Sequence, residues 1–101
     1  MKLISITKSD RPEKKLKAVF ELDNGRTKTT HFGARGMNDY TIYSKSNKKE
    51  AEKHKKAYIA RHQVNEDFNN PTSSGSLSRF ILWNKATLSA SIADFKRRFN
   101  L

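Results

Sequence analysis

The chain has 101 residues and carries 21 lysines and arginines against 10 acidic residues, so its formal net charge at pH 7 is +11. Hydrophobic residues make up only 35% of the chain, below the ~45–50% of ordinary globular proteins, which predicts a single domain over residues 1–101 with a small core. The absence of cysteine excludes disulfides, thiol nucleophiles and thiolate-bound metals.

No segment of the sequence has the pattern that directs a chain into or across a membrane. No apolar run approaches the ~18–20 residues that cross a bilayer, and the start of the chain lacks the ~7–15-residue apolar stretch of a signal peptide. We therefore expect a protein that is neither secreted nor embedded in a membrane. The excess of positive charge predicts a polyanionic partner, with nucleic acid the first candidate and an anionic membrane surface the second.

The first third of the chain is predicted to form an antiparallel meander. Residues 3–7 are rich in β-branched side chains, and residues 16–22 alternate between apolar and other side chains, as in a half-buried strand. The residues on the apolar face of this second strand are Leu16, Ala18, Phe20 and Leu22. Asn24 and Gly25 supply the positive φ angles of a tight hairpin turn, which leads into a third strand at residues 27–32.

A glycine-containing segment follows the predicted sheet. Gly33 and Gly36 indicate turns, and residues 40–43 have the composition of a fourth strand, so the strands are expected within residues 2–43. A glycine-rich backbone with Arg35 beside it could also cradle an anion, but the spacing matches no phosphate-loop or dinucleotide fingerprint. We favour the turn interpretation.

The second half of the chain is predicted to be helical. Asn47, with Glu50 three residues later, resembles a capping box and opens a helix over residues 48–63. Residues 69–76 have the composition of a linker, and two further helices are expected at residues 77–84 and 87–99. The predicted fold class is therefore α+β, a three- to four-stranded antiparallel meander followed by three helices.

The helix over residues 48–63 has a cationic side. At 100° per residue, Lys49, Lys53 and Lys56 share one side of the helix, whereas Ala51 and Tyr58 share the other. Such a stripe can follow a phosphate backbone, where each neutralised phosphate releases counterions. The alternative is an ordinary solvated face on which Glu50 and Glu52 pair with nearby lysines.

Further cations are scattered along the rest of the sequence. Arginine grips a phosphate through two parallel hydrogen bonds, whereas lysine acts as a hydrated point charge. The alternative for this second set is charge that is spread over the surface for solubility. The residues predicted to bind nucleic acid are Lys49, Lys53, Lys56, Arg61, Arg35, Lys28, Lys96, Arg97 and Arg98.

Catalytic and metal-binding patterns are weak. His54 and His62 are eight residues apart rather than at the i, i+4 spacing of a helical zinc pair, and the acidic residues are dispersed. No serine nucleophile motif is present. We therefore expect no enzymatic activity, no metal site and no cofactor.

The segment around Trp83 is apolar on more than one side of a helix. Because the chain's own sheet can cover only one side, this pattern predicts a homodimer interface that contains Phe80, Leu82 and Trp83.

Several motifs in order along the chain resemble a family of short basic proteins of giant double-stranded DNA viruses. The resemblance covers about residues 30–99, and it departs from the family pattern at Met37, where an aromatic residue is usual, and at Ala86, where a proline is usual. It implies a virion or viral-factory protein in the cytoplasm or nucleus of the infected cell, with no established catalytic residues. The motifs are residues 31–36, 39–42, 58–62 and 82–85, with Thr87, Leu88, Ser91, Ile92, Asp94 and residues 96–99.

The leading hypothesis is therefore a virion-associated protein that binds nucleic acid, most simply double-stranded DNA, through its phosphates during genome packaging or organisation. One alternative is a structural virion protein that bridges acidic capsid or core components. A weaker alternative is a metal-dependent enzyme that processes DNA.

Overall fold

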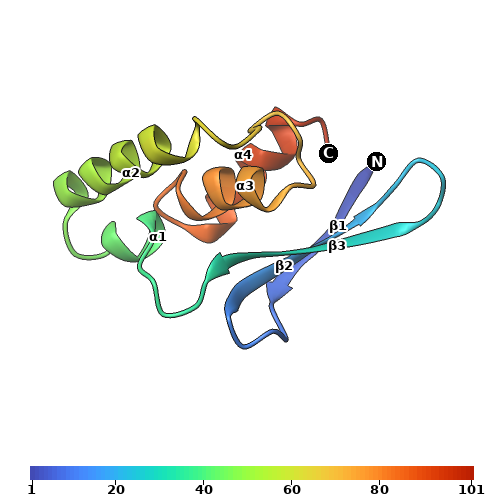
Figure 1. Ribbon diagram of the computed structural model, residues 1–101, viewed down its shortest axis with the longest axis horizontal. Coiled ribbons are helices and arrows are strands. Elements are labelled where there is room, and N and C mark those ends of the chain that lie inside the picture. The colour runs from blue at the N-terminus through green and yellow to red at the C-terminus, as the bar shows by residue number, and fades with distance from the viewer.

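The computed structural model describes residues 1–101 and has the predicted α+β fold (Figure 1). The three strands are β1 (Lys2–Lys8), β2 (Lys14–Glu21) and β3 (Thr27–Ala34). They form one antiparallel sheet in the order β1-β2-β3, so the predicted meander is confirmed. The turn between β2 and β3 is closed by the amide of Leu22, which donates to the carbonyl of Arg26 at 2.8 Å.

One face of the sheet supplies the strand half of the core. Ala18 and Phe20 of β2 and Phe32 of β3 are fully buried, and Leu16 lies opposite Phe32 in the register. The alternation in the sequence produces this arrangement because successive side chains of a strand point to opposite faces. The opposite face is partly exposed and carries residues such as Lys17 and Thr29.

Residues 40–43 form a helical turn, α1 (Tyr40–Tyr43), and the prediction of a fourth strand there is wrong. Asp39 begins this turn, because its buried carboxylate accepts hydrogen bonds from the amides of Thr41 at 3.0 Å and Ile42 at 3.3 Å. A side chain that satisfies the free amides of a first turn outweighs the β-preference of Thr41 and Ile42.

The basic helix α2 (Lys48–His62) has the start that the sequence predicts. The side chain of Asn47 accepts from the amides of Lys49 and Glu50 at 3.0 and 3.2 Å. Figure 1 shows α2 above α1, at the opposite end of the molecule from the turn between β2 and β3. The molecule measures 43 × 26 × 25 Å along its principal axes, so these two ends are well separated.

The predicted linker over residues 69–76 is partly helical, because α3 (Ser74–Leu77) begins inside it. The hydroxyl of Ser73 caps this helix by accepting from the amide of Ser76 at 3.1 Å. The segment also packs on the sheet, since Thr30 donates to the carbonyl of Thr72 at 2.7 Å and Thr72 is buried. A serine-rich composition is typical of linkers and of helix caps alike, so the composition alone did not separate the two.

The helix continues without a break as a π-helical segment, η1 (Ser78–Leu82), which is the segment predicted as a helix over residues 77–84. Phe80, Ile81 and Leu82 are buried in the chain's own core. Phe80 and Leu82, which were predicted to belong to a homodimer interface, are thus covered within one chain and leave little surface for a second copy. The wide π turn places successive apolar residues against several neighbours within one chain.

The last helix is α4 (Leu88–Arg98), as predicted, with Thr87 as its cap. Phe95 is fully buried, and Ile92 and Phe99 pack around the same core, whereas Leu88 is exposed. The radius of gyration is 13.3 Å, close to the ~13 Å of one compact domain of about 100 residues.

Candidate nucleic-acid interface

The lysines of α2 are presented to solvent as the helical spacing predicts. The side chains of Lys49, Lys53 and Lys56 are exposed, while Ala51 and Tyr58 on the opposite side of the helix are buried. We call the three exposed lysines the basic face. No carboxylate lies within ion-pair distance of any of them.

The two acidic residues of α2 interact with groups other than these lysines. Glu52 accepts a hydrogen bond from the hydroxyl of Tyr40 at 2.7 Å. This bond holds the pKa of the Glu52 carboxyl below its usual range and raises the pKa of the Tyr40 phenol, which is also buried. Glu50 lies 3.9 Å from the ring of His54. Neither Glu50 nor Glu52 therefore forms a close ion pair with a lysine of α2, although the charges of Lys55, Lys56 and Lys48 also lower the pKa of Glu52.

Another lysine of α2, Lys55, anchors the helix to the body of the molecule. Its ammonium donates to the carbonyl of Asn84 at 2.9 Å and lies 4.8 Å from the centre of the Tyr40 ring. Partial burial lowers the pKa of Lys55. Lys55 therefore fixes the helix in place, whereas the basic face remains free for a partner.

A row of stacked rings provides the second anchor, and we call it the aromatic stack. Tyr43 of α1 stacks on His54 with ring centres 4.1 Å apart, and Tyr58 stacks on Trp83 at 4.7 Å and on His62 at 4.2 Å. Tyr43 and Trp83 join the two pairs at 6.2 Å. Trp83, predicted to lie in a homodimer interface, is thus covered by α2 of the same chain. The four-residue spacing of His54, Tyr58 and His62 places these three rings on one side of α2 but does not identify Trp83 as their partner.

The remaining predicted cations are mostly engaged within the chain. The guanidinium of Arg35 donates to the carbonyls of Ser9 and Lys14 at 2.9–3.0 Å, so it closes the β1–β2 turn. Lys28 donates to the hydroxyl of Thr72 at 3.2 Å. The glycine-rich segment after β3 therefore acts as a turn, consistent with the positive φ angles of its glycines.

The cations at the end of α4 surround one acidic residue. Arg97 and Arg98 contact the carboxylate of Asp94 at 3.1 and 3.4 Å, and Arg98 also lies 4.5 Å from the centre of the Phe80 ring. Lys96 is exposed and has no such partner.

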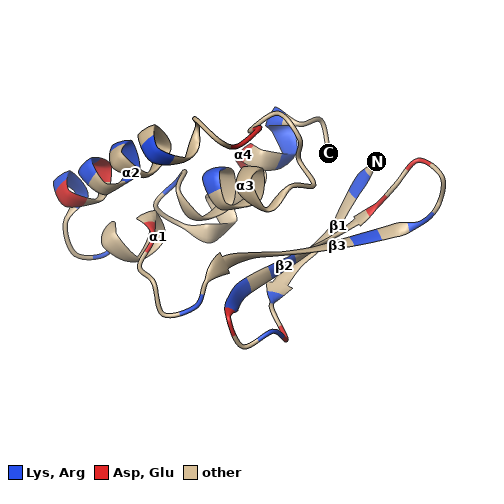
Figure 2. Cartoon of the chain, in the orientation of Figure 1, with Lys and Arg blue, Asp and Glu red and all other residues tan.

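The nine predicted residues do not form one surface. In Figure 2 the basic segments of α2 and of the end of α4 lie along the upper edge, whereas the β1–β2 turn, which Arg35 closes, lies at the lower edge. Lys28 lies toward the turn of the β2–β3 hairpin, at the end of the molecule away from α2. Arg61 belongs to the last turn of α2 and lines a cleft rather than the basic face.

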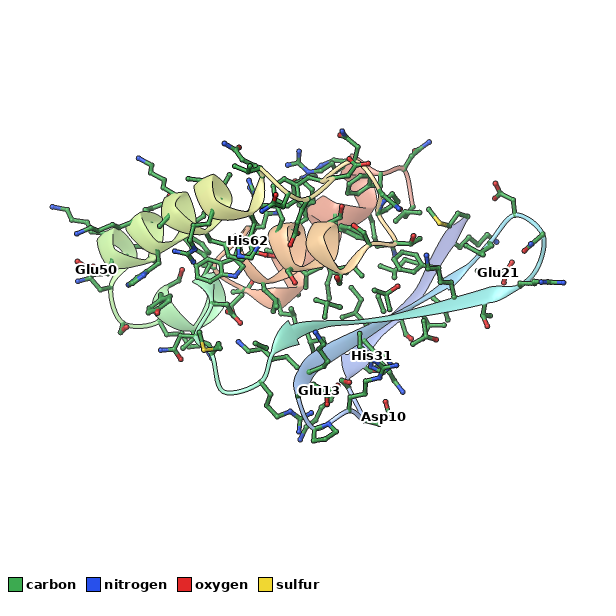
Figure 3. The ribbon with its side chains drawn as sticks, in the orientation of Figure 1. Asp10, Glu13, Glu21, His31, Glu50 and His62 are labelled. Atoms are coloured by element: carbon green, nitrogen blue, oxygen red, sulfur yellow. The ribbon has the colours of Figure 1, made fainter.

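The histidines are dispersed as well (Figure 3). Nδ1 of His31 lies 2.7 Å from the hydroxyl of Ser9 and 3.9 Å from the carboxylate of Asp10, and His62 lies at the far end of α2. No three histidine, aspartate or glutamate side chains come together in an arrangement that could hold a metal ion.

Comparison with known proteins defines the family. Residues 4–62 match the model described as "Family of unknown function (DUF5754)", which is more than half of the chain, and the protein belongs to this family. The match includes all of the sheet except the first two residues of β1, together with α1 and the whole of α2, and it ends before α3. No curated protein and no solved structure matches the chain. None of its helices combines the length and apolar character that a membrane crossing needs.

Proposed function

We propose that the protein binds nucleic acid non-specifically, through contacts between the basic face of α2 and phosphates. The observation that carries this proposal is that Lys49, Lys53 and Lys56 are exposed together and unpaired on a helix that is anchored from behind. A net charge of +11, to which these unpaired lysines contribute, favours binding to a polyanion.

The spacing of the basic face suits a phosphate backbone. Lys49 and Lys56 are seven residues apart, so the face spans about 10 Å of helix axis at ~1.5 Å per residue. One strand carries a phosphate every ~3.4 Å of duplex axis, so a helix that lies parallel to this axis spans about three phosphates of one strand. Lysine ammonium groups act as point charges without a fixed fork of donors, which favours phosphate contacts over base recognition.

The setting that we propose for this binding is a virion or viral factory of a large DNA virus, where small cationic proteins offset the repulsion between genome phosphates. The support for this setting is the resemblance of residues 30–99 to short basic proteins of such viruses. The competing role is contact with acidic virion proteins, and the same experiment separates the two.

The test is the affinity for a labelled DNA duplex of about 20 base pairs, which at ~3.4 Å per pair is longer than the 43 Å molecule. A variant with Lys49, Lys53 and Lys56 replaced by glutamine should bind at least about tenfold more weakly than the natural protein. The matched control replaces Lys2, Lys8 and Lys85 by glutamine and so removes the same charge. These three lysines are also exposed and unpaired.

Equal losses in the two variants would contradict a role for the basic face, because net charge alone would then explain binding. An acidic polypeptide added as competitor gives the second readout. If the polypeptide abolishes binding to the duplex at an equal concentration of negative charge, an acidic protein is favoured as the partner.

A further inference from the structure

A cleft of about 330 Å³ lies between the segment after β3 and the C-terminal end of α2. Its walls carry side chains from four parts of the chain, including Lys14 of β2, Arg61 and His62 of α2, and Trp83 after η1. The cleft is separate from the basic face, none of whose lysines lines it. Its volume is in the range of small-ligand sites.

The charges that line the cleft do not cancel. Lys15 is paired with the carboxylate of Asp39 at 2.6 Å, and His62 Nδ1 lies 3.2 Å from the carboxylate of Glu66. Lys14 and Arg61 also line the cleft, and neither has a carboxylate within ion-pair distance. With His62 neutral, the charged side chains of the lining are the cations Lys14, Lys15 and Arg61 and the carboxylates Asp39 and Glu66, so the cleft keeps a net positive charge and suits a ligand that carries an anionic group.

The cleft also has an aromatic and apolar wall. Tyr58 and Trp83 line it together with Leu82, and the rings of Tyr58 and Trp83 stack at an angle of 9°. Burial raises the pKa of Tyr58 to about 12, so its phenol stays neutral and can donate a hydrogen bond at physiological pH. Ser78 and Asn38 also line the cleft and add small polar groups to it.

We propose that the cleft binds a nucleoside phosphate, with the phosphate at Lys14 and Arg61 and the base along the wall formed by Tyr58 and Trp83. A sugar phosphate would leave the aromatic wall unused, and a fatty acid would place its chain against the polar groups and the carboxylates of Asp39 and Glu66. A planar base with polar edges matches a cleft that combines this aromatic wall with the hydroxyl of Ser78 and the amide of Asn38. The ligand is either a free nucleotide or the phosphorylated end of a strand.

Trp83 makes this proposal directly measurable, because it is the only tryptophan of the chain and lines the cleft. Titration with AMP should change the fluorescence of Trp83 in a saturable way. Adenosine, which lacks the phosphate, and ribose 5-phosphate, which lacks the base, should each bind at least about tenfold more weakly than AMP. The absence of a saturable change up to about 10 mM AMP, which is above the dissociation constant of even a weak specific site, would rule out the free nucleotide and leave only the strand end as the ligand.

Substitutions locate the binding site. Lys14→Ala and Arg61→Ala should each weaken AMP binding about tenfold, since each removes one charge-assisted contact with the phosphate. The matched controls Lys2→Ala and Arg26→Ala remove exposed cations outside the cleft and should leave AMP binding unchanged. A similar loss in both pairs would overturn the proposal, because the ligand would then respond only to total charge. Thermal unfolding of each variant confirms that it is folded.

A last pair of titrations distinguishes the two sources of the ligand. Short single strands with and without a 5′-phosphate are titrated against the Trp83 signal. A preference for the phosphorylated strand that Arg61→Ala removes identifies the strand end as the ligand, whereas saturation by AMP without such a preference identifies the free nucleotide. Failure of both AMP and the phosphorylated strand to saturate the signal overturns the proposal. Duplex binding by the basic face is measured separately and is unaffected by that failure.

Discussion

At the scale of single residues, Asp94 connects two helices. Its carboxylate is buried and accepts a hydrogen bond at 2.7 Å from the side-chain amide of Asn84. The backbone carbonyl of Asn84 in turn accepts a hydrogen bond from the ammonium of Lys55. The bond from Asn84, followed by the contacts of Arg97 and Arg98, holds the pKa of Asp94 below its usual range. Asp94 therefore contributes to the position of α2 although it belongs to α4.

Replacement of Asp94 by alanine should destabilise the protein by about 1–3 kcal/mol at pH 7, because the buried amide of Asn84 would lose its acceptor. Urea unfolding measures the free energy of unfolding. Asp10→Ala, which removes an exposed carboxylate, is the control and should change it by no more than about 0.5 kcal/mol. A loss for Asp94→Ala as small as that of the control would contradict this role.

The contribution of Asp94 should also depend on pH. Because its pKa is lower in the folded protein than the ordinary value of 3.8, the charged form stabilises the fold fully above that value. The stability is lost as the pH falls through the folded pKa. The difference in free energy of unfolding between the natural protein and Asp94→Asn should therefore be constant above about pH 5 and shrink below it. A difference that stays constant down to pH 2 would argue against this linkage.

Substitutions at Gly33 and Gly36 distinguish the cost of backbone strain from the cost of a steric clash. Both have positive φ angles, of 81° and 88°, so an alanine at either position should cost about 1–2 kcal/mol. Only at Gly33 would the added Cβ stand 2.6 Å from a methyl group of Leu82, whereas nothing lies within 4 Å at Gly36. Gly33→Ala should therefore lower the melting temperature more than Gly36→Ala, and equal shifts would show that Leu82 moves aside without cost.

At the scale of the elements, the position of α2 depends on the aromatic stack. Trp83→Ala should destabilise the protein by about 2–4 kcal/mol. Because Trp83 contacts Tyr58 of α2, hydrogen exchange should accelerate most in α2 and least in β2. Val64→Ala, which truncates an exposed side chain, is the control. Uniform acceleration over the whole chain would indicate that α2 does not open separately.

The elements that the sequence predicted well are those with two independent local signals. Alternation together with the Asn24-Gly25 turn located β2 and β3, and the cap at Asn47 together with good helix formers located α2. Residues 40–43 were predicted to be a strand because their own composition favours β-structure. The cap that makes them helical comes from Asp39, which lies outside this segment. The stacking of Trp83 on Tyr58 joins residues 25 positions apart, and no local pattern specifies such a contact.

At the scale of the whole molecule, the positive charge divides into free and engaged cations. The sequence predicted which lysines share a side of α2, because helical geometry alone determines that arrangement. It could not show that Arg35 binds backbone carbonyls or that Arg97 and Arg98 surround Asp94, because hydrogen-bond partners are set by tertiary packing. Lys96 and Arg61 also have no carboxylate partner but lie outside the basic face, so three of the nine predicted residues, Lys49, Lys53 and Lys56, form the candidate interface.

The central claim is that the basic face contacts phosphates, and the salt dependence of duplex binding tests it most directly. The slope of log K against log salt concentration should be steep and negative for the natural protein. It should become shallower by about 2–3 when glutamine replaces Lys49, Lys53 and Lys56, since each lost phosphate contact removes about 0.9 from the slope. The variant that lacks Lys2, Lys8 and Lys85 should keep the natural slope. Parallel slopes for all three proteins would contradict the account.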